Sequence, residues 1–256
     1  MLPFIFLSGY SIPTYILMGV IAYFVSSFFI VLDRKNYKIC LVDSIMLCII
    51  TFFAGILGAK AFHLVGEIVK KQNIFTIDYW NNHSFLSGFV WYGGVIAALL
   101  FIVLYCKVRR LDINGVLDLM TFFALTFDAI GRIGCLLSGC CYGVEIDWGI
   151  PIYGINRFPS PLFESALCVV ILLNIRIWKI YLKNKGMIFS FYLLSYAIGR
   201  FILEFLRGDI TRGRIGIFST SQWISIVIIC AFVFYGLNKK LIKSKCRNSS
   251  IKDGCI

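Results

Sequence analysis

Charged side chains are scarce in this sequence. They make up 15% of its 256 residues, whereas a soluble domain has about 25%. Hydrophobic residues account for 59%, and so little charge cannot provide them with a hydrated surface. The composition therefore excludes a soluble enzyme, a nucleic-acid-binding domain and a disordered chain.

The sequence is rich in long apolar runs. A helix needs about 20 apolar residues to cross a bilayer, and continuous runs of this length indicate helices because a bilayer admits only helices or closed barrels. Such runs recur near residues 11–32, 44–65, 86–106, 115–141, 161–178, 186–206 and 217–237. We predict an all-α, polytopic membrane protein with seven transmembrane helices.

The sequence has a net charge of +12, and its basic residues are distributed unevenly among the segments between the predicted spans. Fifteen Lys and Arg residues lie in segments 33–43, 107–114 and 179–185 and in the tail from residue 238, and only six lie in the alternate segments. The positive-inside rule then predicts an N-terminus outside and a C-terminus in the cytoplasm. Residues 1–238 would form the membrane domain and 239–256 a short basic cytoplasmic tail. The basic charge is thus explained by topology, and we expect no nucleic-acid partner. Met1–Tyr10 lacks a basic segment, so we expect no cleavable signal.

Ten cysteines are present, and most lie singly in apolar spans, where Cys behaves as a small hydrophobic residue. Only Cys135, Cys140 and Cys141 cluster in the sequence. Their spacing is neither C-x-x-C nor that of a zinc ribbon, so we expect no metal site.

Two arginines lie inside the predicted spans. A charged side chain in the membrane is energetically costly, so each of them calls for a structural or functional explanation. Arg200 stands 14 residues after Gly186, roughly 21 Å along a helix, which leaves it near the outer surface of a core of about 30 Å. Tyr196, Glu204 and Arg207 share its helix face. Arg132 lies toward the same surface on another span. We therefore expect a polar cavity that opens outward.

Further polar or flexible residues fall at the same level. Asp128, four residues before Arg132, is placed to pair with it, and the stretch from Gly131 to Gly143 is rich in glycine. A structural Arg–Asp pair with glycine-mediated helix packing is the alternative explanation. The other groups are Tyr15, Tyr92, Gly134, Ser160 and Glu164. Two arginines favour an anion, phosphate matches paired guanidinium groups best, and apolar walls suggest that the phosphate belongs to a lipid.

These residues resemble the bacterial prolipoprotein diacylglyceryl transferases. Gly131–Gly143 is similar to the signature of that family, and Tyr196–Arg207 is similar to its second arginine motif. Arg157–Glu164 resembles its His-Pro-Ser-x-Leu-Tyr-Glu segment, and Trp91–Gly94 its aromatic-His-Gly-Gly motif. The resemblance covers nearly all of the chain, in order.

The resemblance implies transfer of the diacylglyceryl group of phosphatidylglycerol to the lipobox cysteine of prolipoproteins, the first step of bacterial lipoprotein maturation. It implies a multi-pass protein of the bacterial cytoplasmic membrane that uses no cofactor. The implied catalytic residues are Arg132, Arg200, Tyr92 and Glu204. The implied phosphatidylglycerol-binding residues are Arg132, Tyr15, Tyr196, Gly143, Gly134, Ser160, Glu164 and Arg207.

The sequence departs from the family pattern at several positions. Tyr92 stands where the family often has His, and Tyr is the poorer base near neutrality. The base is therefore open: Tyr92 would position lipid, and the thiol proton would go to Glu164 or water. Cys135 and Cys140 replace the Asn and Glu of the signature, and Phe158 replaces a His. Two other functions stay open, a non-catalytic lipid-binding or transporting paralogue and a membrane thiol oxidoreductase that uses Cys140 and Cys141.

Overall fold

Apolar helices dominate the structure. A computed structural model of the chain describes residues 2–7, 10–69, 90–178, 181, 184–208 and 214–234. The predicted tail 239–256 and the end of the last predicted span lie outside the described residues. The helices are α1 (Thr14–Asp33), α2 (Leu41–Val69), α4 (Trp91–Arg109), α5 (Ile113–Ser138), α6 (Ser160–Trp178) and α7 (Met187–Leu203), with short 3₁₀ helices at Arg34–Tyr37 (η1) and Glu204–Leu206 (η2).

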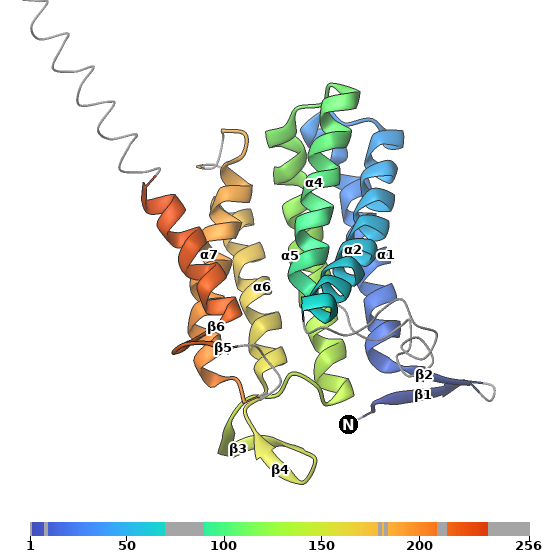
Figure 1. Cartoon of the computed structure of the whole chain (residues 1–256). Coiled ribbons are helices and arrows are strands. Elements are labelled where there is room, and N and C mark those ends of the chain that lie inside the picture. Colours follow the sequence, from blue (N-terminus) through green and yellow to red (C-terminus); the bar gives the residue numbers. More distant parts are fainter. Residues whose placement is uncertain are drawn as a thin grey trace, which may run out of the picture. The chain divides into compact units, whose positions relative to one another are not determined.

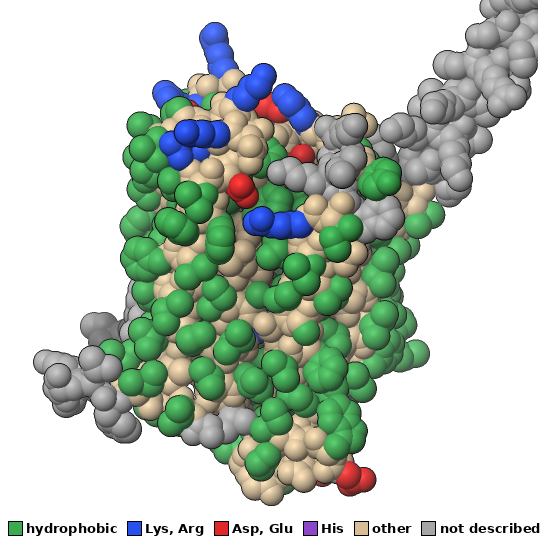
Figure 2. Space-filling model, turned by 180° about the vertical axis from the view of Figure 1, so that it is seen from behind, with side chains coloured by type: hydrophobic (Ala, Val, Ile, Leu, Met, Phe, Trp, Pro, Cys, Tyr) green, Lys and Arg blue, Asp and Glu red, His purple; other side chains and the backbone are tan. Residues whose placement is uncertain are grey.

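Six of these helical segments are long and apolar enough to cross a membrane. They begin and end within a few residues of the first six predicted spans. The seventh prediction falls on a shorter apolar helix, described over Thr220–Phe234. Large apolar side chains point outward from the helices, for example Phe24, Leu57 and Val227, each about two-thirds exposed. Figure 2 shows such side chains over the flanks of the helices and Lys and Arg near helix ends. A polytopic helical membrane protein accounts for this surface, because lipid is the solvent that apolar flanks require.

The chain divides into two compact units. Unit 2 covers Tyr23–Phe123 and is built on the antiparallel pair α2 and α4. A side chain on Gly58 would lie 2.6 Å from the carbonyl oxygen of Gly93, and one on Gly94 would lie 2.8 Å from that of Gly55. The two glycines after Tyr92 therefore serve close helix packing, as small residues do in membranes.

The two helices of this pair are also joined by polar contacts at one end. Asp43, near the start of α2, accepts hydrogen bonds from the Tyr105 hydroxyl at 2.7 Å and from Nε of Arg109 at 3.0 Å. Both donors lie near the end of α4. The basic residues before α2 and at the end of α4 therefore lie at the same end of unit 2.

Unit 1 combines Met1–Ala22 with Ala124–Ile256. It holds the first part of α1, the larger part of α5, and α6, which packs against α7. The bulky residues Leu125, Ile152, Ile171 and Ile175 are almost fully buried. Apart from Tyr92, the polar residues of the next section all belong to this unit.

Three small antiparallel hairpins were missed by the all-α prediction. They pair β1 (Phe4–Leu7) with β2 (Tyr10–Pro13), β3 (Glu145–Ile152) with β4 (Ile155–Arg157), and β5 (Arg214–Ile215) with β6 (Phe218–Ser219). Tyr153 and Gly154 link β3 to β4 with φ of 53° and 80°. Two consecutive positive φ angles are typical of the tight turns that join hairpin strands. In Figure 1 this hairpin lies beyond the ends of α6 and α7.

Candidate active site

Glu164 forms ion pairs with three arginines. Its Oε1 lies 2.5 Å from Nη1 of Arg200 and 2.5 Å from Nη1 of Arg207, and its Oε2 lies 2.7 Å from Nη1 of Arg132. The side chain of Glu164 is 1% exposed. A carboxylate so far from water keeps its charge only when it is paired and hydrogen-bonded, and here three guanidinium groups pair with it.

Two further carboxylates extend this network. Nη2 of Arg200 lies 2.7 Å from Oε2 of Glu204, one turn later on the same helix face. Nε of Arg132 lies 3.2 Å from Oδ1 of Asp128, as its spacing predicts. Three guanidinium groups and three carboxylates thus balance in charge. We call these residues the arginine network: Asp128, Arg132, Glu164, Arg200, Glu204 and Arg207.

Three consecutive helices and the segment that follows the last of them supply the network. Asp128 and Arg132 lie on α5, and Glu164 lies one turn after Ser160, the residue that begins α6. Pro161 is accepted at this helix start because the first turn needs no backbone N–H there. Arg200 lies in the last turn of α7, which continues into η2 and places Arg207 against Glu164.

Backbone hydrogen bonds hold the segment after α5 against the network. The N–H of Gly143 donates to the carbonyl of Phe158 at 2.8 Å, and the N–H of Val144 donates to the carbonyl of Leu206 at 3.0 Å. Gly143 also forms an isolated bridge with Arg207. A side chain on Gly143 would lie 2.5 Å from the Leu206 carbonyl oxygen, so this close approach requires glycine.

The remaining predicted residues lie in four different settings. Tyr196 reaches the network, because its hydroxyl donates to Oδ2 of Asp128 at 3.0 Å. Tyr15 is half-exposed at the start of α1, and its Cα lies 3.6 Å from where Gly134 would carry a Cβ. Ser160 is fully buried, and its hydroxyl has no hydrogen-bond partner among the described residues. Tyr92 belongs to unit 2, whereas the network is built from unit 1 alone.

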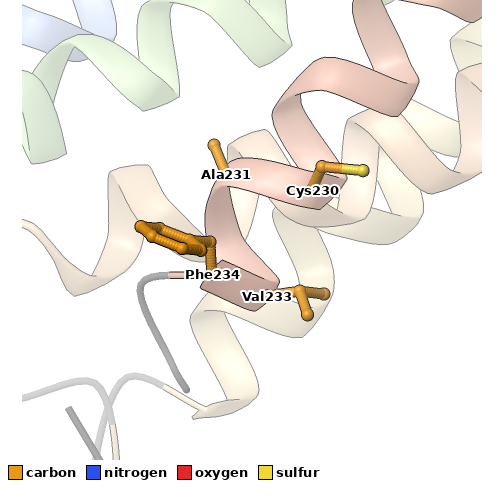
Figure 3. Close-up of a pocket in the computed structure, with 4 residues that line it drawn as sticks. All are labelled: Cys230, Ala231, Val233 and Phe234. Atoms are coloured by element: carbon orange, nitrogen blue, oxygen red, sulfur yellow. The ribbon is translucent and has the colours of Figure 1, made fainter. Parts of the chain in front are cut away.

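The network is closed upon itself rather than lining the open cavity that we expected. The side chains of Arg200 and Arg207 are 5% and 3% exposed, and that of Arg132 is 12% exposed. The carboxylates of Asp128, Glu164 and Glu204 pair with the arginines, where we expected an anionic ligand. A hollow of about 570 Å³ lies elsewhere, beside Cys230, Ala231, Val233 and Phe234 of the last described helix (Figure 3). It is lined by none of the predicted site residues.

Comparison with known protein families matches residues 3–237 to the family described as prolipoprotein diacylglyceryl transferase. The chain belongs to this family. It is 34% identical to "Phosphatidylglycerol--prolipoprotein diacylglyceryl transferase 2" of Clostridium perfringens (strain 13 / Type A) over 204 residues, which cover 75% of this chain and 77% of that protein.

Two other relatives carry the same name without the numeral. The chain is 34% identical to the protein of Clostridium tetani (strain Massachusetts / E88) over 203 residues, with 73% of this chain and 78% of that protein covered. It is 28% identical to the protein of Campylobacter hominis over 245 residues, with 90% and 85% covered. The match therefore runs through both units.

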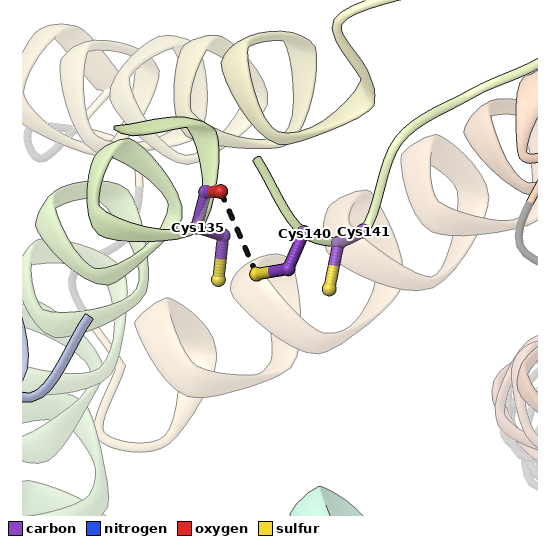
Figure 4. Close-up of side chains that lie close together, drawn as sticks. All are labelled: Cys135, Cys140 and Cys141. Carbon is purple, nitrogen blue, oxygen red and sulfur yellow. Dashed lines mark hydrogen bonds between the residues drawn. The ribbon is translucent and has the colours of Figure 1, made fainter. Parts of the chain in front are cut away.

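In this member of the prolipoprotein diacylglyceryl transferase family, three thiols meet where α5 ends (Figure 4). The sulfur atoms of Cys135, Cys140 and Cys141 all lie within 4.8 Å of one another. Hydrogen bonds with the Cys135 and Cys140 thiols, together with the charges of Arg207 and Arg132, hold the pKa of the Cys141 thiol below its usual range, although burial opposes this shift. The spacing along the chain does not predict this cluster, because the fold of the helix end creates it.

Two polar residues of α6 that contact α5 beside the arginine network were missed. The Cys168 thiol donates to Oδ2 of Asp128 at 3.4 Å, and the Ser165 hydroxyl donates to the carbonyl of Ala129 at 2.8 Å. Cys168 lies one turn after Glu164. The recurrence of Ser160, Glu164 and Cys168 at intervals of four is the signal that marks this face of α6.

Proposed function

We propose that this chain transfers the diacylglyceryl group of phosphatidylglycerol to a cysteine thiol of a prolipoprotein, the first step of bacterial lipoprotein maturation. It would be a thioether-forming transferase. The observation that carries the proposal is the arginine network, which joins three of the motifs that resemble the family through the single carboxylate of Glu164. The names of the relatives support the same substrates.

The reaction moves one group between two atoms. The acceptor sulfur, as a thiolate, forms a bond to a carbon of the diacylglyceryl group while the bond from that carbon to the phosphate oxygen breaks. The electron pair leaves with the oxygen, so that glycerol phosphate and a thioether result. The enzyme must stabilise the negative charge that develops on the phosphate, and preorganised positive charge serves this purpose.

Arg132 is the arginine that we assign to the phosphate. Among the three guanidinium groups on Glu164 it has the most exposed side chain, at 12%. Arg200 and Arg207 are buried, and both hold Oε1 of Glu164. We therefore treat Arg200, Arg207 and Glu204 as positioning residues that fix Glu164 and, through it, Arg132. A lipid phosphate would compete with Glu164 for one side of the Arg132 guanidinium group.

The lipid chains need an apolar surface next to this phosphate. Tyr15 is half-exposed beside Gly134, two residues after Arg132, and we assign it to the lipid. Ser160 is buried one turn before Glu164, and its unpaired hydroxyl would bind a glycerol oxygen. Tyr196 orders Asp128, which holds Nε of Arg132.

Glu164 is a poor choice for the base that removes the thiol proton. Both of its oxygens contact guanidinium groups, so a proton there would disrupt these ion pairs. This leaves water, or a group that ionises the thiol directly.

The proposed membrane is the bacterial cytoplasmic membrane, crossed seven times with the N-terminus outside. The distribution of Lys and Arg supports this orientation. The acceptor would present its cysteine in a lipobox at the outer surface, where the two arginine-bearing spans end.

Release of glycerol phosphate tests the proposal. Purified full-length protein in detergent is incubated with phosphatidylglycerol labelled in its headgroup and a lipobox peptide. We expect water-soluble label only when the peptide contains cysteine, and a serine peptide is the control. Binding of phosphatidylglycerol without release of label would instead favour a lipid-binding paralogue. Oxidation or reduction of the peptide without release would favour a thiol oxidoreductase.

A further inference from the structure

The thiol cluster is a consequence of how α5 ends. The N–H of Gly139 donates to the carbonyl of Leu136, and the N–H of Cys140 donates to the carbonyl of Cys135, both at 3.1 Å. Gly139 has φ of 72°. This pair of hydrogen bonds around a left-handed glycine is the Schellman cap, which brings the residue after the glycine onto the last turn of the helix. Cys140 is therefore placed beside Cys135 by the backbone itself.

The third thiol is placed by the next residue. Cys141 has φ of 60°, a left-handed conformation that turns the chain back. The segment that follows is fixed by the hydrogen bonds of Gly143 and Val144 to Phe158 and Leu206. The three sulfur atoms thus converge in the free protein, each on a half-buried residue (Figure 4).

The geometry of the cluster is close to that of a metal site. A zinc–sulfur bond of about 2.3 Å implies sulfur atoms about 3.8 Å apart in a tetrahedral site. The sulfur atoms lie within 4.8 Å of one another, so a contraction of about 1 Å or less for each pair completes the site. Rotation about the side-chain bonds of cysteine is enough for such a change.

The charge around the cluster also suits a bound metal. Three thiolates and one Zn²⁺ carry a net charge of −1, which needs a positive neighbour in a half-buried place. Arg207 and Arg132 both interact electrostatically with Cys141, and Arg132 also interacts with Cys135. The arginine network is balanced in charge as a whole, but two of its guanidinium groups act directly on these thiols and oppose their negative charge.

We propose that Cys135, Cys140 and Cys141 bind one Zn²⁺ as thiolates and leave its fourth position for the thiol of the acceptor cysteine. This proposal replaces the expectation, based on spacing, that the chain has no metal site. Its second half rests on the proposed transferase function. Zinc sites with three protein ligands and one open position are typical of catalysis, whereas purely structural sites have four ligands.

The arginine network offers no free base that could remove the proton of the acceptor thiol. Coordination of this thiol at the open position of the zinc site would ionise it instead. A thiol that coordinates zinc is deprotonated, and its proton passes to water. The coordinated sulfur then forms its bond to the diacylglyceryl carbon as the carbon–oxygen bond breaks, and the phosphate leaves with the electron pair. The neutral thioether no longer binds as a thiolate and leaves the metal. Tyr92 in place of the family's His is then no obstacle.

Cobalt substitution tests the site without lipid turnover. The full-length protein in detergent, reduced with a phosphine, is titrated with Co²⁺ as a spectroscopic substitute for Zn²⁺. We expect one Co²⁺ per chain with thiolate-to-cobalt absorption, which Zn²⁺ abolishes by displacement. Cys135→Ser, Cys140→Ser and Cys141→Ser should each weaken binding by more than the 10- to 100-fold that loss of an outer hydrogen-bond partner typically costs. Cys230→Ser, at an exposed position on the last described helix, is the matched control and should bind as the unmodified chain does.

The open coordination position of the metal is tested by a separate measurement. A lipobox peptide with cysteine should change the cobalt spectrum, and the same peptide with serine should leave it unchanged. In the unmodified chain, Zn²⁺ should slow alkylation of Cys140 and Cys141 and leave that of Cys230 unaffected, which tests the site even where a variant fails to fold. Absence of thiolate-to-cobalt absorption, or equal binding by all four variants, would overturn the site. An unchanged spectrum with the cysteine peptide would overturn the open position.

Lipid transfer, measured separately, distinguishes this proposal from the proposed function. Transfer at the full rate by metal-free protein would refute the role of the metal and leave the transferase. A cobalt-binding protein that responds to the cysteine peptide but transfers no lipid would refute the transferase and leave the site.

Discussion

Replacing Arg200 by lysine keeps the charge of the arginine network but removes the guanidinium group that contacts two carboxylates at once. Arg200 uses two different nitrogen atoms, with Nη1 2.5 Å from Glu164 and Nη2 2.7 Å from Glu204. Lysine has one ammonium nitrogen on a flexible stem and cannot provide the planar fork. In Arg200→Lys the contact of this side chain with one of the two carboxylates is therefore lost.

The size of the effect follows from that lost contact. A hydrogen bond to a charged group contributes about 1.5–3 kcal/mol, and about 1.4 kcal/mol corresponds to a tenfold change in rate. If Glu164 must be held in place for Arg132 to bind the phosphate, transfer should fall roughly 10- to 150-fold. The side chain of Arg200 is 5% exposed, so water cannot replace the missing donor.

The assay is the initial rate of lipid transfer to a lipobox peptide at equal amounts of folded protein. Arg176→Lys is the matched control, because Arg176 is exposed in the last turn of α6. A surface change of about 0.5 kcal/mol or less leaves its rate within roughly twofold of the original. Arg200→Lys with the original rate would refute the argument that the fork, and not the charge, is required.

Three further predictions concern the surroundings of the network. Gly134→Ala should destabilise the protein by about 1–3 kcal/mol, because the new methyl group would lie 2.6 Å from the Cβ of Met18, whereas Gly131→Ala in the same helix meets no atom within 4 Å and should gain up to about 1 kcal/mol from helix propensity. Denaturant titration in detergent compares the two, and equal effects would contradict the packing argument. Glu164→Gln should lower the free energy of unfolding by about 3–5 kcal/mol, since three buried guanidinium groups lose a charged partner, and an unchanged unfolding midpoint would be evidence against the network. Tyr196→Phe should slow transfer roughly 2- to 10-fold by freeing Asp128 from its hydroxyl donor, and a loss as large as that of Arg200→Lys would mean that Tyr196 contacts the substrate.

Hydropathy predicts the helices well because the length of a span is set by the membrane. The six long apolar helices match predicted spans, and the i, i+4 spacing of Arg200 and Glu204 is sufficient to predict their common face. The pair of Asp128 and Arg132 follows from the same rule. These are local relations along a single helix.

The role of Glu164 depends instead on contacts between helices. Nothing in the sequence of α6 indicates that one carboxylate receives arginines from α5, from α7 and from the segment after η2. Ion pairs therefore occupy the place of the predicted cavity. The hairpins were missed because five of the six strands have only two to four residues and the Tyr153–Gly154 turn is a weak signal. The thiols converge through the cap that ends α5, which their spacing along the chain does not reveal.

The mass of a lipobox peptide after incubation with phosphatidylglycerol and the full-length protein decides whether this chain transfers the diacylglyceryl group. We expect a diacylglyceryl adduct on the cysteine, absent with Arg132→Ala and Arg200→Ala and retained with Arg176→Ala. A folded protein that binds phosphatidylglycerol and leaves the mass of the peptide unchanged would contradict the proposed transferase activity.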